Sequence, residues 1–181
     1  MIVNIETFNS YSGNYEDNSS AILLKETFLL SAQQIVTGYL GYDPIEQECS
    51  DVFLSGNGTK KLYLPSNNIT QLLSIRINNL DVDVEDFKPK DDYIICKNIS
   101  DLFPVGNENI KVNYIGGWAI QDMPSVIVLS ILRIATLMLS ETDGNIGLTG
   151  KSFPDNSRTF INYSNYKKYL QPLDSLRIIR F

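Results

Sequence analysis

Hydrophobic residues recur at helical spacing in two stretches of the chain. In the first stretch, residues 21–36, apolar side chains recur every three or four positions after Ser19, a residue type that favours a helix start. In the second, residues 126–139 follow Pro124 and are apolar on nearly every face. We therefore expect two long helices, and we expect the second to be hidden from water.

The segment between these helices changes to an alternating pattern, which is typical of β-strands. Apolar residues alternate on both sides of a Gly-rich turn at 55–59, which predicts a β-hairpin there. Alternation returns in residues 69–77, 82–84 and 110–115. We expect a β-rich insert over about residues 46–115.

The part after the second long helix changes character again. Residues 141–162 are polar and rich in glycine, and we expect a long loop there. Tyr163, Tyr166 and Tyr169 then lie three residues apart and predict one face of a short final helix, which ends near Pro172.

Together these elements predict an α+β fold, with a helical core of two long helices and a short C-terminal helix. The β-rich insert lies between the first two helices. Residues 1–17 are expected to be a polar lead-in with weak order, residues 18–172 a single domain, and residues 173–181 a C-terminal tail. A chain of 181 residues is long enough to bury a core.

Composition and charge exclude several functions. The net charge of -6, from 21 acidic and 15 basic residues, argues against a protein that grips a nucleic-acid backbone. It permits DNA to pass without specific binding. The N-terminus has no basic-then-apolar signal pattern, and residues 126–139 are too short for a bilayer span and contain Arg133. We expect a cytosolic setting without a membrane.

The sequence contains no histidine, which removes His-based acid–base catalysis, Ser-His and Cys-His nucleophile pairs and most zinc sites. Cys49 and Cys96 are predicted to be unpaired thiols. We therefore expect no enzyme, no cofactor and no metal. A small enzyme that uses a pair of carboxylates remains a rival interpretation, although no pair is singled out by its setting.

Two short motifs resemble ligand loops and fail on spacing. Residues 150–152 read Gly-Lys-Ser, but a phosphate loop needs glycine where Asn145 stands and a helix afterwards. Residues 81–86 alternate acids as a calcium loop does, but Asp86 occupies the position that needs glycine. An exposed strand fits the second motif better.

Trp118, which follows two glycines, is interpreted as a plug where backbones cross closely, with a ligand-stacking platform as the alternative. The tyrosines of the final helix are similarly open to base stacking, although packing against the first helix is preferred. These residues define an alternative function: a small non-catalytic module that binds nucleic acid or a glycan.

The tail alternates apolar and basic residues where chain ends are usually polar. Such a segment either folds back onto its own domain or docks into a neighbour, and the residues alone favour neither. The residues concerned are Leu176, Arg177, Ile178, Ile179, Arg180 and Phe181.

The order of these features resembles the phage head–tail connector family, also called adaptor or head-completion proteins. The resemblance rests on the opening helix running into residues 37–43, on Leu-Tyr-Leu-Pro at 62–65, and on the strand, Gly-Gly-Trp and Pro-started helix of 109–139. It covers roughly residues 18–175.

This resemblance implies a non-catalytic virion protein at the head–tail junction, assembled in the host cytoplasm. Such proteins form a ring, typically of twelve copies, beneath the portal protein. They extend the DNA channel and carry the next neck, stopper or tail component. The C-terminal tail of the chain is then the candidate for docking on the portal protein. The candidates for contacts with neighbouring subunits or the neck are Gly56, Asn57, Gly58, Trp118, Lys151 and Phe153.

Overall fold

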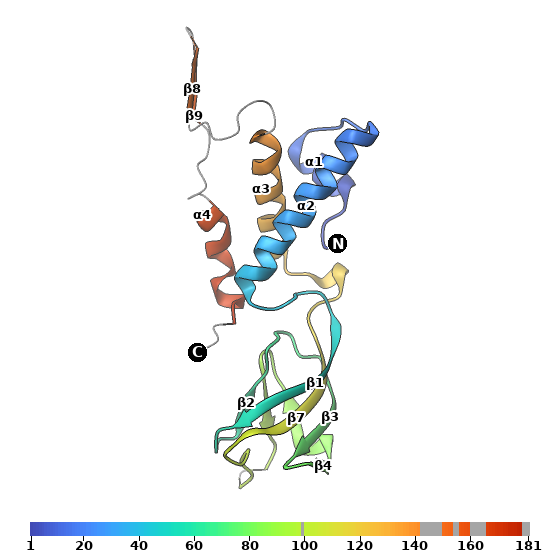
Figure 1. The fold of residues 1–181 in the computed structure, drawn as a ribbon, viewed down its shortest axis with the longest axis vertical. Coiled ribbons are helices and arrows are strands. Elements are labelled where there is room, and N and C mark those ends of the chain that lie inside the picture. Colours follow the sequence, from blue (N-terminus) through green and yellow to red (C-terminus); the bar gives the residue numbers. More distant parts are fainter. Residues whose placement is uncertain (99, 142–149, 154–155, 160–165, 179–181) are drawn as a thin grey trace. The chain divides into compact units, whose positions relative to one another are not determined.

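The computed structural model describes residues 1–98, 100–141, 150–153, 156–159 and 166–178 (Figure 1). The chain divides into two compact units. A helical unit contains Met1–Leu40 and Pro124–Arg177, and a β unit contains Gly41–Met123 together with Ile178. The β unit is therefore inserted in the sequence of the helical unit. No helix among the described residues is long and apolar enough to cross a membrane.

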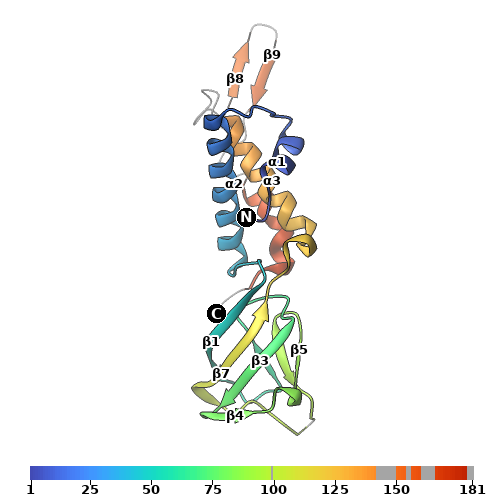
Figure 2. The same ribbon diagram turned by 90° about the vertical axis from the view of Figure 1, so that its right-hand side faces the viewer.

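The helical unit is built around two long helices that pack against each other (Figures 1 and 2). Its helices are α1 (Ile5–Ser12), α2 (Ser19–Leu40), α3 (Ser125–Glu141) and α4 (Tyr166–Leu170), and α4 continues into the 3-10 helix η4 (Gln171–Leu176). α2 buries one stripe at helical spacing, consisting of Leu29, Ala32, Val36 and Leu40. Burial of these apolar side chains stabilises the pair of helices.

The predicted helical core of two long helices and a short C-terminal helix is wrong, because the described residues form four α-helices. α1 lies in the lead-in that was expected to have weak order. It begins at Asn4, whose side chain accepts a hydrogen bond from the Thr7 amide, ends at Gly13 in the left-handed conformation, and buries Phe8 fully. The final helix α4 has only five residues before it tightens into η4.

The long loop predicted for residues 141–162 is also wrong in part. Two antiparallel strands, β8 (Gly150–Phe153) and β9 (Asn156–Thr159), lie within it. Both strands are four residues long, and alternation over so few positions gives no usable pattern.

The β unit contains two antiparallel sheets. The larger has the order β1-β7-β3-β4, from Gln47–Gly56, Gly106–Gly116, Gln71–Ile77 and Leu80–Val82. The smaller has the order β2-β6-β5, from Lys61–Tyr63, Tyr93–Cys96 and Phe87–Pro89. Short 3-10 turns lie at Val84–Asp86 (η1) and Ile120–Asp122 (η2). A shared core of buried residues from both sheets includes Leu62, Ile75, Ile94, Phe103 and Tyr114.

The predicted hairpin around the Gly-rich turn is wrong, because its two arms belong to different sheets. Leu54 in β1 lies opposite Ile110 in β7, whereas Leu62 in β2 lies opposite Ile94 in β6. The turn itself pairs with a distant segment, since the Gly58 amide donates to the Phe103 carbonyl at 2.9 Å. An alternating pattern of apolar and polar residues predicts where a strand lies, but it does not predict which strand pairs with it.

Candidate functional site

Trp118 lies at the entrance to the β unit, where the chain arriving from α2 meets the chain that leaves β7. Its amide donates to the Pro44 carbonyl at 2.8 Å, and its carbonyl accepts from the Glu46 amide at 2.9 Å. The half-buried indole packs against the Tyr42 ring with centroids 6.3 Å apart. These contacts agree with the interpretation of Trp118 as a plug.

Gly117 makes this crossing possible. Its φ of +98° is one that side-chain-bearing residues rarely adopt, and an added Cβ would lie 2.5 Å from the Ile45 carbonyl oxygen. The Gly-Gly-Trp sequence therefore holds two backbone segments in a close crossing, and it does not form a mobile loop.

Tyr42 is the most strongly perturbed titratable group at this crossing. Burial raises the pKa of Tyr42 to about 12, and the nearby Asn67 side chain lowers it by a smaller amount. The phenol is therefore neutral at physiological pH and acts as a packing group.

The predicted contact residues at the Gly-rich turn differ in exposure. Gly56 is buried, and a Cβ there would lie 1.8 Å from the Pro104 carbonyl oxygen, so this glycine is required by the close approach of two backbones. Asn57 is exposed and its side-chain oxygen accepts from the amide and hydroxyl of Thr59. Gly58 is half-buried. Asn57 is thus the residue of the three that this turn presents to solvent.

Lys151 and Phe153 belong to β8, where the backbone of Lys151 lies opposite Arg158 and that of Phe153 opposite Asn156. Their side chains lie outside the described part of the chain, so the hairpin is placed by its backbone alone.

The described part of the tail contacts the C-terminal end of α2. The Arg177 guanidinium lies 4.8 Å from the centre of the Tyr39 ring, and the Tyr39 hydroxyl donates to the Asp174 carboxylate. That hydrogen bond is the main reason why the pKa of Tyr39 is raised. Ile179, Arg180 and Phe181 lie outside the described residues.

The tyrosine stripe packs within the helical unit, as far as it is described. Tyr166 and Tyr169 are half-buried, and the Arg133 guanidinium lies 5.8 Å from the centre of the Tyr169 ring. The Ser130 hydroxyl lies 2.9 Å from the Tyr169 carbonyl oxygen. Tyr163 falls outside the described residues, and Trp118 belongs to the other unit.

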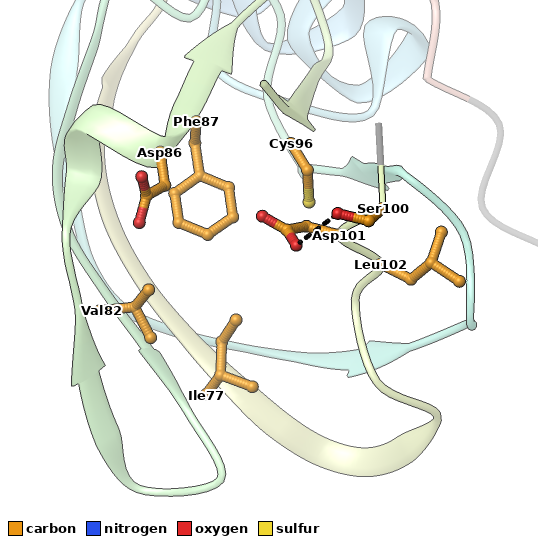
Figure 3. A pocket seen from close by; sticks show the side chains of 8 residues that line it. All are labelled: Ile77, Val82, Asp86, Phe87, Cys96, Ser100, Asp101 and Leu102. Carbon is orange, nitrogen blue, oxygen red and sulfur yellow. Dashed lines mark hydrogen bonds between the residues drawn. The ribbon is translucent and has the colours of Figure 1, made fainter. Parts of the chain in front are cut away.

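The β unit also contains an open pocket of about 460 Å³ (Figure 3). It is lined by Ile77, Val82, Asp86, Phe87, Cys96, Ser100, Asp101 and Leu102. The Asp101 carboxylate accepts from the Asn98 amide at 3.0 Å and from the Ser100 hydroxyl at 3.3 Å.

Chemically this pocket offers little for catalysis. Burial, with a smaller effect of the Asp101 charge, raises the pKa of the Cys96 thiol, which disfavours the nucleophilic thiolate. Phe87 is stacked on Phe103 with centroids 5.5 Å apart, so the pocket wall continues the core of the β unit. Among the described residues, no three acidic, cysteine or histidine side chains gather in a way that would hold a metal ion.

No protein-family model and no curated protein sequence matches the chain. Solved structures do match, at low sequence identity. The chain is similar to a protein in a structure described as the neck of an empty GTA particle computed with C6 symmetry, with a TM-score of 0.61, 10% identity, and coverage of 99% of this chain and 91% of the other.

Two further structures agree. A protein in the neck of a native GTA particle, computed with C12 symmetry, gives a TM-score of 0.58 at 10% identity and covers 98% of this chain and 89% of the other. A protein in the virion of a native gene transfer agent particle gives 0.57 at 11% identity, with 99% and 91% covered. At such identity the likeness establishes a shared fold, and it extends over nearly the whole chain.

Proposed function

We propose that this chain is a structural protein of the neck of a phage-like particle, without catalytic activity, and that its copies form a ring at the junction of head and tail. The observation that supports this most is the fold likeness, over 98–99% of the chain, to proteins in two neck structures and one virion structure of a gene transfer agent particle. Two of those structures were computed with sixfold and twelvefold symmetry, which is the symmetry of a ring.

The ring, with twelve copies as the expected number, sits beneath the portal protein and extends its channel. DNA passes without specific binding, in keeping with the net charge of -6. The ring then joins the portal to a stopper or tail component in the virion, after assembly in the host cytoplasm.

Electron microscopy combined with native mass spectrometry tests the proposal, using the purified protein alone and mixed with the portal protein of the same particle. A ring in either sample supports it. A protein that stays monomeric in both samples overturns it. Salt-sensitive binding of that monomer to single-stranded DNA, or binding to a glycan, would instead favour the binding-module alternative.

Portal docking is assigned to residues Leu176–Phe181 of the C-terminal tail. Deleting from Asp174 onward would remove the partner of the Tyr39 hydroxyl and disturb the helical unit itself. Deletion of Ile179–Phe181 is the cleaner test, because it leaves Asp174 and Arg177 in place. We expect this variant to keep its thermal unfolding midpoint and to lose binding to the portal protein. Normal binding would show that docking uses another surface.

A further inference from the structure

The outer face of α2 carries an apolar stripe that no described part of the helical unit covers. Leu23 is 66% exposed and Leu30 is 49% exposed. They lie seven residues apart, on the side of α2 opposite its buried stripe. The Thr27 hydroxyl between them bonds back to the Leu23 carbonyl at 2.8 Å, so its donor is satisfied within the helix. Two leucines held in water at this spacing form an apolar ridge.

A single negatively charged residue lies at the centre of this face. Glu26 lies three residues after Leu23 and four before Leu30, which places it beside both leucines on the helix surface. Its side chain is exposed, and no ion pair links it to the described residues. The ridge of Leu23, Glu26, Thr27 and Leu30 is therefore apolar with one carboxylate.

A groove of complementary character lies elsewhere on the helical unit. Its volume is about 210 Å³, and it is lined by Tyr11 of α1, by Arg133, Thr136, Leu137 and Ser140 of α3, and by Tyr169 of α4. The α3 residues are spaced at three, four and seven positions, so they form one stripe of that helix. A pocket that binds a small molecule usually needs roughly 300 Å³ or more, so side chains of a partner are the better occupant.

The charge and polarity of the groove are complementary to those of the ridge. Arg133 is exposed and stacks on Tyr169, and no carboxylate among the described residues pairs with it. The Thr136 hydroxyl oxygen is buried without a hydrogen-bond partner in the described part of the chain. Leu137 and the two tyrosine rings supply apolar surface around these polar groups.

The ridge and the groove lie on different sides of the helical unit. Within it, α3 packs against both α2 and α4, and these two helices lie on different sides of α3 in Figure 1. The groove stripe of α3 is turned away from the fully buried Ile127, Ile131 and Ala135 on the same helix. Two different surfaces that fit each other make a head-to-tail contact, which repeats from copy to copy and closes into a ring when the rotation allows it.

We propose that the α2 ridge of one copy docks into the groove between α1, α3 and α4 of the next copy, with Glu26 facing Arg133. This inference rests on the proposed ring and names the surface through which neighbouring copies recognise each other. Leu23 and Leu30 supply the apolar part of the contact. The Glu26–Arg133 pair fixes its register and favours this orientation over others.

Two charge reversals and their mixture test the contact. Glu26→Arg and Arg133→Glu each place like charges across every interface, so each variant alone should need at least about tenfold more protein for half-assembly. In an equimolar mixture the two variants can alternate around the ring, and every interface then regains one Arg and one Glu. We expect the mixture to assemble within about threefold of the wild-type concentration, since like-charge contacts are absent from the alternating arrangement.

The readout is native mass spectrometry of the full chain, alone or on the portal protein if rings form only there. Circular dichroism melting of each variant checks that the helical unit is intact. Leu30→Ser should weaken assembly in the same assay, while Leu80→Ser, at a 71% exposed leucine of the β unit, serves as its matched control.

The outcomes separate this inference from the proposed function. If the wild-type protein forms rings and either reversal leaves assembly unchanged, the proposed contact is wrong. The same holds if the mixture fails to restore assembly. In both cases the ring proposal itself is unaffected. A wild-type protein that never forms rings overturns both.

Discussion

Lys25 is a buried cation that forms no ion pair with a carboxylate in the part of the chain that the structure describes. Only 1% of its surface is exposed, and its Nζ donates to the Asn9 side chain at 2.8 Å, the Asn14 carbonyl at 2.8 Å and the Glu16 carbonyl at 2.7 Å. These are all three of the donors that an ammonium has. One side chain of α2 thereby holds α1 and the connection from α1 to α2.

Lys25→Met tests this role while keeping most of the side-chain volume. It leaves three oxygens without their donor, and we expect a loss of about 1–3 kcal/mol of unfolding free energy. Urea unfolding measures the loss, and hydrogen exchange of residues 13–18 should become faster. Lys167→Met, at an exposed position of α4, is the control. Unchanged stability would mean that relief from burying the charge offsets the lost bonds.

Tyr42 makes stability depend on pH in the alkaline range. Its pKa is raised from 10.0 to about 12, so between these values the unfolded chain has lost a proton that the folded chain retains. Below pH 10 the two states bind the proton equally, and as pH rises through this window the stability falls by roughly 2–3 kcal/mol. Tyr42→Phe should remove this contribution. Urea unfolding of both proteins at pH 8, 10 and 11 gives the comparison, and parallel curves would contradict the prediction.

At the level of elements, α3 is joined to α4 by one buried hydroxyl. Ser130 is 3% exposed, and its Oγ lies 2.8 Å from the Val126 carbonyl and 2.9 Å from the Tyr169 carbonyl. Its single proton can serve one of these oxygens at a time. A five-residue helix such as α4 is too short to be stable alone, so it depends on such contacts.

Ser130→Ala should loosen α4 more than it destabilises the whole protein. The expected loss of unfolding free energy is about 1 kcal/mol, because one hydrogen bond disappears and almost no volume changes. Hydrogen exchange should quicken in Tyr166–Leu170 and stay unchanged in the first half of α2. Exchange that changes equally in both segments would argue against a local role.

The two long helices were the elements that the sequence pattern located best, because their runs of apolar residues are long. Strands β3 and β7 were also located, but not their partners, since pairing depends on residues distant in sequence, such as Gln71 with Ile115. The eight-residue α1 was missed because its stability comes from Phe8 and from the Lys25 contacts.

Candidate surfaces were harder to predict than elements. Trp118 was interpreted as a plug from the two glycines before it. Leu23 belongs to the apolar pattern of residues 21–36 that predicted the first helix, but the rotation between Leu23 and Ala32 places them on opposite sides of that helix, and Leu23 is exposed. The groove could not be read from the sequence at all, because its walls come from three helices that only the tertiary structure brings together.

At the scale of the whole molecule, the β unit has what an independently folding domain needs. Its core cluster consists of residues from Leu62 to Tyr114, and its strands pair only with one another among the described residues. The chain enters through Gly41 and leaves through Met123. A separate core and self-contained pairing are the properties of a domain.

A fragment of residues 41–123 should therefore fold alone. We expect a strand-type circular dichroism spectrum and a single cooperative thermal transition, because the buried cluster is complete within the fragment. The variant Ile94→Ala in the same fragment, which removes a fully buried side chain, should lose about 2–5 kcal/mol of stability. A fragment without a cooperative transition would show that the helical unit is needed for its folding.

The pairing of β1 with β7 also determines how the β unit bears a pulling force. The strands are antiparallel neighbours, with Gln47 opposite Gly116 at one end of the ladder and Gly56 opposite Gly106 at the other. The chain therefore enters and leaves at the same end, next to the hydrogen bond between Trp118 and Pro44. Tension applied through the two chain ends of the unit therefore breaks the hydrogen bonds between β1 and β7 one after another. It does not load all of them at once, as a shearing force would. The β unit should therefore unfold at a lower force when it is pulled from its two chain ends than when the force acts parallel to its strands.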